Sequence, residues 1–312
     1  MGAASILIVH PDRKIQRTVQ RILGGTGHGV DVADDLEQAV RLLAHRSPLL
    51  VVADGSAMAS PSLEEFFAAA RARGAEACMT LVGASQLEQM PRILGLGAVT
   101  NLLVHPMPVL GEELTITAQK LLRDDLFGAE KYLLWGTELC TITLARSSQR
   151  PQVVGDLGDQ IRGRGQSARI ASSAMLVADE LLSNAVHNAP VDEAGRHYRA
   201  EVPRDAELPL DGRHEVVLRW GCDGRYVAIE VSDRFGSLGR DLVLRSLAQS
   251  DVKDQGSGAG MGIALTYRAC DHLVFNLAPG KRTEVIALLD VRQPAAERGP
   301  ASSFNVFVER DR

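Results

Sequence analysis

The stretch DELLSNAVHNA, residues 179–189, decides the fold of the second half of this chain. It closes the longest helix that the sequence predicts, Ala168 to Ala189, and Pro190 ends that helix because proline has no N–H to continue the hydrogen-bond ladder. Glu180 and Asn184 lie four residues apart and therefore on one face of the helix. A carboxylate and an amide on one face can hold a hydrated Mg²⁺ ion beside a triphosphate, because hard cations prefer oxygen ligands.

Two further residues compete for the next place on that face. His187 and Asn188 lie three and four residues after Asn184, and the helical repeat leaves open which of them shares the stripe. We interpret both as structural groups or as partners of the water around Mg²⁺ rather than as catalysts. Of the two, Asn188 is the candidate for contact with a nucleotide.

A second segment with the chemistry of a ligand site follows a predicted strand, Tyr226 to Ser232. Asp233 comes directly after this strand, where its carboxylate could accept a hydrogen bond from an exocyclic amine. Gly236 and Gly239 follow, and glycine lets the backbone approach a planar ligand closely. The segment therefore predicts a place for a planar, amine-bearing ring.

A third segment, GAGMG at residues 258–262, precedes a helix predicted over Gly262 to Cys270. Free backbone N–H groups before a helix, together with the helix amino terminus, can cradle phosphate. The candidate phosphate-binding residues are Gly258, Gly260, Met261 and Gly262. A glycine-rich segment alone is more often a turn than a phosphate site, and only its place after the other two segments favours a nucleotide site.

These three segments, in this order, resemble the N, G1 and G2 boxes of the GHKL superfamily of gyrase-type ATPases, histidine kinases and anti-sigma-factor serine kinases, over residues 136–290. The resemblance implies an α+β two-layer (Bergerat-type) domain that uses ATP and Mg²⁺. It also implies that Glu180 is the catalytic base, that Asn184 holds Mg²⁺, and that Asp233 reads adenine. Thr283 would support Asp233 through its hydroxyl.

The G1 segment departs from the family pattern by one residue. The pattern is Asp, any residue, Gly, whereas Asp233 is separated from Gly236 by two residues, the second of which is Phe235. Phe235 must therefore be accommodated where a glycine would let the adenine lie close.

The first half of the chain alternates between short apolar strands and helices. The strands are predicted at residues 5–9, 30–33, 49–53, 79–82 and 102–104. The helices are predicted from after His10-Pro11-Asp12 to Leu23 and at 36–44, 62–73, 86–94 and 111–125. Continuous apolar strands that alternate with helices predict an α/β fold with a doubly wound, five-stranded parallel sheet. With Asp54 at the end of the third strand, this half resembles the flavodoxin-like receiver domain of response regulators.

The resemblance assigns Asp54 as the phosphoacceptor, but the residues around it depart from the family pattern. The acidic pair after the first strand is replaced by His10 and Pro11, with only Asp12 beyond them, and the hydroxyl and lysine positions read Gly83 and His105. A proline and a neutral imidazole cannot replace two carboxylates around Mg²⁺. We therefore expect weak or absent phosphorylation, and a protein-interaction module. The alternatives are a loop-capping role for Asp54 and a pH- or metal-sensitive site that includes the two histidines.

Four segments follow from these patterns: a receiver-like (pseudo-receiver) domain at 1–125, a helical linker at 126–135, a GHKL ATPase- or kinase-like domain at 136–293, and a tail at 294–312 that could add an edge strand at Phe304 to Val308. The 312 residues are long enough for two domains that each bury a core.

Composition excludes several function classes. A net charge of −5 gives no electrostatic support for nucleic-acid binding. No apolar run approaches the roughly 20 residues that cross a bilayer. The cysteines Cys78, Cys140, Cys222 and Cys270 lie far apart, which indicates reduced thiols and a cytoplasmic location.

We interpret the chain as a bacterial two-component-type signalling protein. A degenerate receiver would regulate a GHKL domain that acts on a partner signalling protein in trans. The domain would either phosphorylate the partner, as a serine- or histidine-type kinase, or sequester it. A weak ATPase is a further possible activity of this domain. The alternative is a non-catalytic scaffold or nucleotide sensor. A gyrase-like ATPase that acts on DNA is not supported, because the sequence shows neither a transducer domain nor an excess of basic charge. The identity of the partner and the existence of a homodimer stay open.

Overall fold

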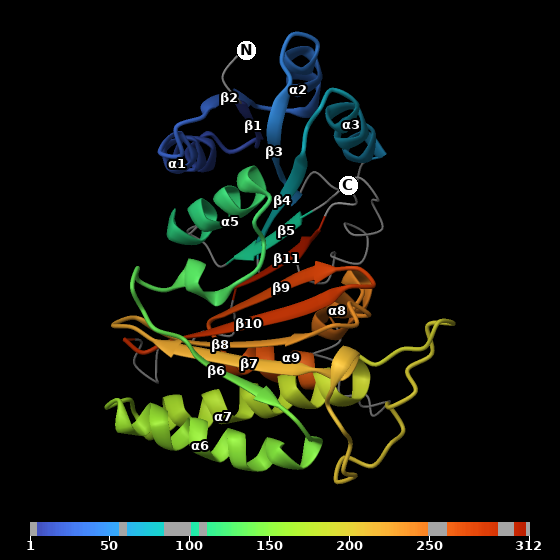
Figure 1. Ribbon diagram of the computed structural model, residues 1–312. Helices are drawn as coiled ribbons and strands as arrows, with labels where there is room; N and C mark the ends of the chain where they lie inside the picture. The colour runs from blue at the N-terminus through green and yellow to red at the C-terminus, as the bar shows by residue number, and fades with distance from the viewer. Residues whose placement is uncertain are drawn as a thin grey trace. The chain divides into compact units, whose positions relative to one another are not determined.

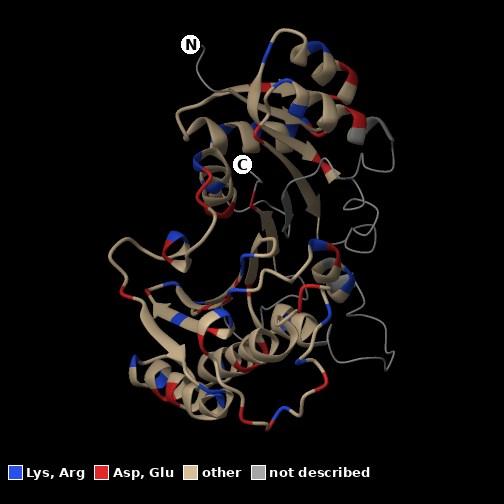
Figure 2. Cartoon of the chain, turned by 45° about the vertical axis from the view of Figure 1, so that its right-hand side comes forward, with Lys and Arg blue, Asp and Glu red and all other residues tan. Residues whose placement is uncertain are grey.

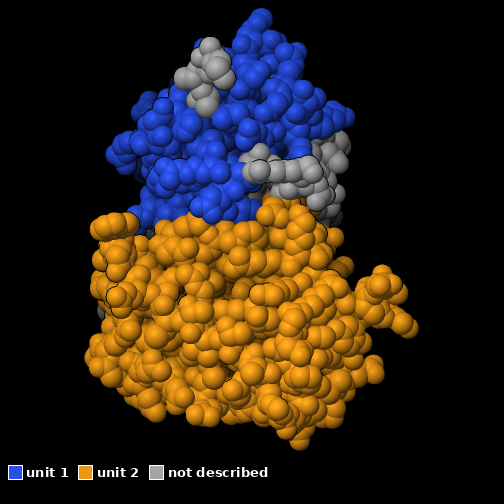
Figure 3. Space-filling model, viewed as in Figure 1, with its two compact units in different colours: residues 1–126 blue, residues 127–312 orange. Residues whose placement is uncertain are grey.

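The computed structural model describes residues 5–55, 61–83, 101–105, 111–248, 261–292 and 303–309. The chain divides into two compact units, Met1–Leu126 and Phe127–Arg312 (Figure 3). Each unit has its own buried apolar residues, such as Ile8 and Val52 in the first and Ile229 and Ile286 in the second.

The first unit is built on a parallel sheet with the strand order β2-β1-β3-β4-β5 (Figure 1). Its strands are β1 Ser5–Val9, β2 Gly29–Ala33, β3 Pro48–Asp54, β4 Ala77–Gly83 and β5 Asn101–His105. Each neighbouring pair runs parallel. The central strands read as continuous apolar runs because both faces of a parallel sheet are buried. The predicted α/β fold with a parallel sheet is confirmed, in the flavodoxin-like order.

Helices follow the strands of the first unit. They are α1 Arg13–Gly24, α2 Leu36–Leu43, α3 Pro61–Ala72 and α5 Gly111–Arg123. Asp12 begins α1 by accepting hydrogen bonds from the backbone N–H groups of Lys14 and Ile15, at 2.7 and 3.3 Å. α1 packs against α5, and α2 packs against α3. The helix predicted over residues 86–94 lies outside the described residues.

The second unit has a mixed sheet with the order β11-β9-β10-β8-β7-β6. Its strands are β6 Cys140–Leu144, β7 Val216–Cys222, β8 Tyr226–Asp233, β9 His272–Ala278, β10 Arg282–Asp290 and β11 Ser303–Val308. Strands β6 to β10 pair antiparallel with their neighbours, and β11 lies parallel beside β9. The strand predicted in the tail is therefore present as β11.

Helices of the second unit pack in a layer on this sheet (Figure 1). They are α6 Arg150–Gly163, α7 Ala168–Ser183, α8 Arg240–Ala248 and α9 Met261–Ala269. α7 contacts β7, β8 and β10, while α9 contacts both α7 and β9. Ile170, Ala174 and Leu181 are among the buried residues of α7 and recur at helical spacing, so the face of α7 that meets the sheet is apolar.

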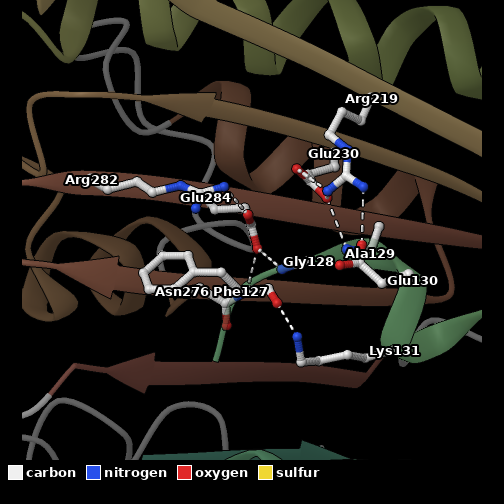
Figure 4. Close-up of polar contacts among 10 residues, drawn as sticks. All are labelled: Phe127, Gly128, Ala129, Glu130, Lys131, Arg219, Glu230, Asn276, Arg282 and Glu284. Atoms are coloured by element: carbon white, nitrogen blue, oxygen red, sulfur yellow. Dashed lines mark hydrogen bonds and ion pairs between the residues drawn. The ribbon is translucent and has the colours of Figure 1, made fainter. Parts of the chain in front are cut away.

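The segment predicted as a helical linker, residues 126–135, is not a continuous helix. It contains one short 3₁₀ turn, Ala129–Tyr132. The N–H groups at its start are used outside the segment, because Gly128 donates to Oε1 of Glu284 and Ala129 donates to Oε2 of Glu230, each at 2.8 Å (Figure 4). Buried carboxylates need donors, and the free N–H groups of a short turn supply them.

Charged residues of both signs are interspersed along the helices and loops of each unit (Figure 2). This agrees with the small net charge of −5. Within the described residues, no helix is both long and apolar enough to cross a bilayer.

Candidate functional site

The second unit contains a cavity of about 170 Å³ between α7, β8, β10 and α9. Four of the polar residues singled out in the sequence line it, namely Asn184, Asn188, Asp233 and Thr283. Most of the rest of the wall is apolar and includes Leu181, Val231, Leu242, Ile263, Phe275 and Val285. Three segments far apart in the sequence therefore meet around one space with apolar walls and a few polar groups, which is the usual composition of a small-molecule site.

The size of the cavity indicates what it can enclose. An apolar cavity of roughly 150 Å³ accepts a benzene molecule. At about 170 Å³ this cavity has room for a planar ring system, with larger parts of a ligand extending out of it. A flat base with a polar tail is a ligand of that shape.

The end of α7 explains how two asparagines reach the cavity together. Asn184–Asn188 forms a single π turn, in which Ala189 donates its N–H to the carbonyl oxygen of Asn184 at 2.9 Å. The wider turn brings Asn188 to the same side as Asn184, and Nδ2 of Asn188 donates to Oδ1 of Asn184 at 2.8 Å. Of the two candidates for this face, the structure selects Asn188.

His187 points into the interior instead. Its side chain is buried, and burial lowers the pKa of the imidazole to about 4, helped by the positive charges of Arg204 and Arg150. The histidine is therefore neutral at pH 7.

Glu180 and Asn184 lie against the start of α9. A Cβ atom placed on Gly262 would stand 2.5 Å from Oε2 of Glu180 and 3.4 Å from Nδ2 of Asn184. Only a glycine therefore lets the first turn of α9 approach the carboxylate this closely. Met261 begins α9, whereas Gly258 and Gly260 lie outside the described residues.

The electrostatic environment of Glu180 contains charges of both signs. Partial burial raises the pKa of its carboxyl group, and the neighbouring Asp179 raises it further. Arg150 and Arg204 act in the opposite direction. A half-buried carboxylate with a raised pKa is the usual environment of a general base.

Asp233 ends β8 at the wall of the cavity, directly opposite Thr283 of β10. Its Oδ1 atom accepts hydrogen bonds from the N–H groups of Phe235 and Gly236, at 2.8 and 3.2 Å. Burial nevertheless raises the pKa of Asp233 to about 6, against the effect of these bonds. The Thr283 hydroxyl adjoins the carboxylate without a hydrogen bond of normal geometry.

Gly236 has a role other than the one predicted. Its φ angle is 59°, and a Cβ atom there would stand 2.2 Å from the carbonyl oxygen of Ala278 and 2.6 Å from the N atom of Lys281. The glycine is required because the chain packs on the β9–β10 hairpin, and Gly236 is not part of the cavity wall. Gly239 has no atom within 4 Å of its Cβ position.

Phe235, the additional residue of this segment, is turned away from the cavity. Its ring is buried among Tyr198, His214 and Arg213, with ring centroids at 6.5 and 5.4 Å and the guanidinium carbon at 4.8 Å. All three partners belong to the irregular stretch around residues 191–214. The additional residue therefore anchors this stretch and leaves the cavity open.

The irregular stretch contributes residues that the sequence reasoning missed. His197 and Ala200 line the cavity, and Nδ1 of His197 contacts the carbonyl oxygen of Asn188 at 2.5 Å. Ser237 also lines it and donates to the carbonyl oxygen of Ala189 at 2.6 Å. Since residues 191–213 have no hydrophobic periodicity, no local signal could have placed His197 and Ala200 at the site.

The first unit has a smaller polar site at the carboxyl end of its strands. Asp54 ends β3, and Nε2 of His10 lies 3.7 Å from its Oδ1 atom. Nδ1 of His10 accepts a hydrogen bond from the N–H of Asp12 at 3.0 Å, which leaves the proton of a neutral imidazole on Nε2, facing the carboxylate. An imidazole therefore adjoins the Asp54 carboxylate.

The other residues predicted near Asp54 are Asp12, Gly83 and His105. The Asp12 side chain caps α1, as described above. Gly83 and His105 end β4 and β5 as paired residues, and the His105 side chain lies outside the described residues. Within the described part of the chain, no group of three or more His, Cys, Asp or Glu side chains could hold a metal ion.

No family model and no curated protein matches the chain. Solved structures match its amino-terminal part. Chemotaxis protein CheY4 of Vibrio cholerae is 21% identical, with 38% of this chain and 99% of that chain covered and a TM-score of 0.31. The receiver domain of NtrX from Brucella abortus is 23% identical, with 38% and 98% covered and a TM-score of 0.33.

A third match is the signal receiver domain of an HD domain-containing protein from Pseudomonas fluorescens Pf-5. It is 22% identical, with 39% of this chain and 96% of that chain covered and a TM-score of 0.34. The amino-terminal part of the chain is thus similar to response-regulator receiver domains.

Proposed function

We propose that the second unit is a GHKL-type domain that binds ATP with Mg²⁺ in the cavity between α7, β8, β10 and α9. The chain would then be a two-component-type signalling protein. Its receiver-like unit regulates the nucleotide-binding unit, which phosphorylates or sequesters a partner signalling protein in trans.

One observation carries the proposal: Asn184, Asp233 and Thr283, which lie in three separate segments, line one cavity. The same end of α7 meets the start of α9 at Gly262. The residues fit the ligand, because the apolar wall suits a base, the buried Asp233 can accept from an amine, and the first turn of α9 offers N–H groups to a phosphate.

Each polar residue then has a specific task. The oxygen of the Asn184 amide is a suitable ligand for Mg²⁺, which would neutralise phosphate charge when bound. Asp233 orients the base through its carboxylate. Glu180, with its raised pKa, accepts a proton from water or from a hydroxyl of the partner protein.

Calorimetric titration of the full chain with ATP and Mg²⁺ tests the proposal. The wild type should bind, and Asn184→Ala should lose at least about tenfold in affinity, since one ligand to a charged group contributes about 1.5 kcal/mol or more. Gln160→Ala, an exposed amide change on α6, is the matched control and should bind as the wild type does. Absence of binding by the wild type would refute the proposal.

A second candidate is a non-catalytic scaffold, in which both units only bind partner proteins. The observation that favours it is His10 beside Asp54, which removes the acidic environment of a working phosphoacceptor. The titration separates the two candidates, because a scaffold without nucleotide chemistry gives no heat with ATP. A nucleotide sensor would bind ATP without turnover, so an assay for released phosphate distinguishes it from an enzyme.

A further inference from the structure

Arg204, from the irregular stretch before β7, lies over the carboxyl end of α7. Its Nη1 atom is 3.4 Å from the carbonyl oxygen and 3.2 Å from the hydroxyl of Ser183, and its Nη2 atom is 3.5 Å from Oδ1 of Asn188. Asn188 lines the cavity. A guanidinium group is therefore held beside the polar end of the proposed nucleotide site, by a segment outside the three sequence motifs.

The acceptors of Arg204 are few and neutral. A guanidinium has five N–H donors, whereas the three contacts above are all at the long end of the hydrogen-bond range. Burial and the positive charge of Arg150 lower the pKa of the Arg204 guanidinium, and the charge of Glu180 acts in the opposite direction. Among the described residues, Arg204 forms no salt bridge with a carboxylate. Much of its capacity to bind an anion is therefore uncommitted.

The other arginines of the same stretch are used differently. Arg196 pairs with Asp192 at 2.8 Å, Arg199 is buried and donates to the carbonyl oxygen of Pro209, and Arg213 lies over the Phe235 ring. Arg204 alone among these four is directed at α7 through contacts with Ser183 and Asn188.

We propose that Arg204 binds the terminal phosphate of the nucleotide in the cavity and makes the site selective for a triphosphate over a diphosphate. This inference rests on the proposed function. The base would occupy the apolar cavity at Asp233, and the phosphates would extend past Asn184 and Asn188 toward Glu180. A planar guanidinium beside Asn188 and Glu180 is then placed at the far end of the phosphate chain, where it matches phosphate oxygens in two-pronged geometry.

A structural role for Arg204 predicts a different result. The contact with the Ser183 carbonyl oxygen satisfies one of the acceptors at the end of α7, as basic side chains commonly do. If that were its whole contribution, removing it would lower the thermal stability of the protein and weaken ATP and ADP binding equally. The ratio of the two affinities therefore separates the two roles.

The experiment is calorimetric titration of the full chain with Mg²⁺-ATP and with Mg²⁺-ADP. The proteins are the wild type, Arg204→Ala, Arg204→Gln as a milder change, and Arg196→Ala as the matched control from the same stretch. We expect Arg204→Ala to lose about tenfold or more in ATP affinity and less than about twofold in ADP affinity, because one charge-assisted contact is removed. Arg204→Gln should follow the same pattern, and Arg196→Ala should change neither affinity.

The measured affinities distinguish the proposed role of Arg204 from a purely structural one. Loss of ATP affinity with ADP affinity kept supports the inference, and it does so through Arg204→Gln even if the alanine variant unfolds. An unchanged ratio of ATP to ADP affinity in both Arg204 variants overturns the inference while the proposed function stands. A wild type that binds neither nucleotide overturns both.

Discussion

The backbone N–H of Ala129 donates a hydrogen bond to Oε2 of Glu230 over 2.8 Å. Glu230 is buried in the middle of β8, where desolvation and the charge of Glu284 both raise its pKa. Residues alternate between the two faces of a strand, so Glu230 points away from the face to which its neighbour Val231, a cavity residue, belongs. The start of the second unit and the candidate site thus lie on opposite faces of the same strand.

Several other groups complete this arrangement (Figure 4). Arg219 binds both Glu230 and Glu130, at 3.1 Å each. Oε1 of Glu284 accepts hydrogen bonds from Nδ2 of Asn276 and from the N–H of Gly128, each at 2.8 Å. Two buried carboxylates therefore have their negative charges compensated by donors from the sheet and from the 127–131 segment.

Replacement of the buried carboxylate should destabilise the second unit. Glu230→Ala leaves the Ala129 N–H without its acceptor and Arg219 with only the more exposed Glu130, and loss of one member of a buried ion pair costs roughly 3–5 kcal/mol. Glu130→Ala, which removes the half-exposed partner of the same arginine, should cost about 1 kcal/mol or less. Urea unfolding curves for both variants measure the difference. Equal effects would show that the buried contacts do not hold the 127–131 segment.

Two buried groups should give opposite pH dependences of stability. The folded pKa of Asp233, about 6, lies above the 3.8 that is usual for an exposed aspartate, so its contribution is present at low pH and is lost as the pH rises through 6. The folded pKa of His187, about 4, lies below the 6.5 that is usual for an exposed histidine, so its contribution is present above pH 6.5 and is lost as the pH falls toward 4.

The two contributions offset each other in the wild type between pH 4 and 6.5, and single variants should separate them. The free energy of unfolding of Asp233→Asn, relative to the wild type, should rise by about 2 kcal/mol from pH 4 to pH 6.5, because most of the shift of about two pKa units falls within that range. For His187→Gln the relative value should fall over the same range. Denaturant titrations at several pH values measure both, and a flat difference for Asp233→Asn would contradict its raised pKa.

The close approach of α9 to Glu180 depends on the absence of a side chain at Gly262. In Gly262→Ala the new Cβ atom would displace the Glu180 carboxylate, since the two would be 2.5 Å apart. The carboxylate is the end of a flexible side chain, so the fold should survive with a thermal midpoint near that of the wild type. If the proposed function holds, ATP turnover should fall by about tenfold or more, as expected when a proton acceptor is misplaced.

Gly239→Ala is the matched control for this change, because no atom lies within 4 Å of its Cβ position. It should bind and turn over ATP within about twofold of the wild type, a difference of less than roughly 0.5 kcal/mol. Equal activity of Gly262→Ala and Gly239→Ala would show that Glu180 takes no part in ATP turnover.

Acetyl phosphate should leave Asp54 unlabelled in the wild type, even with Mg²⁺. The imidazole of His10 lies 3.7 Å from the Asp54 carboxylate and cannot replace a carboxylate as a ligand of a hard cation. His10→Asp places a second carboxylate there and should increase labelling. Mass spectrometry of the intact protein measures the added phosphoryl group, and stoichiometric labelling of the wild type would refute the pseudo-receiver interpretation.

Local sequence patterns are sufficient to predict the parallel sheet of the first unit, whose described strands lie within two residues of their predicted ends. Strands buried on both faces are apolar throughout, and helices between them repeat at 3.6 residues, so each element carries its own local signal. The order of Glu180, Asn184 and Asp233 along the chain also predicts one site, and Asn184 and Asp233 line one cavity.

Tertiary structure alone decided the remaining details. The π turn at Asn184 chose Asn188 over His187, the β9–β10 hairpin required Gly236, and the 127–131 segment became a short turn on two buried carboxylates. Arg204 lies 16 residues after Asn188 in the sequence and contacts it at the end of α7. These features depend on contacts between residues distant in the sequence, which leave no periodic pattern, so only the folded chain brings them together.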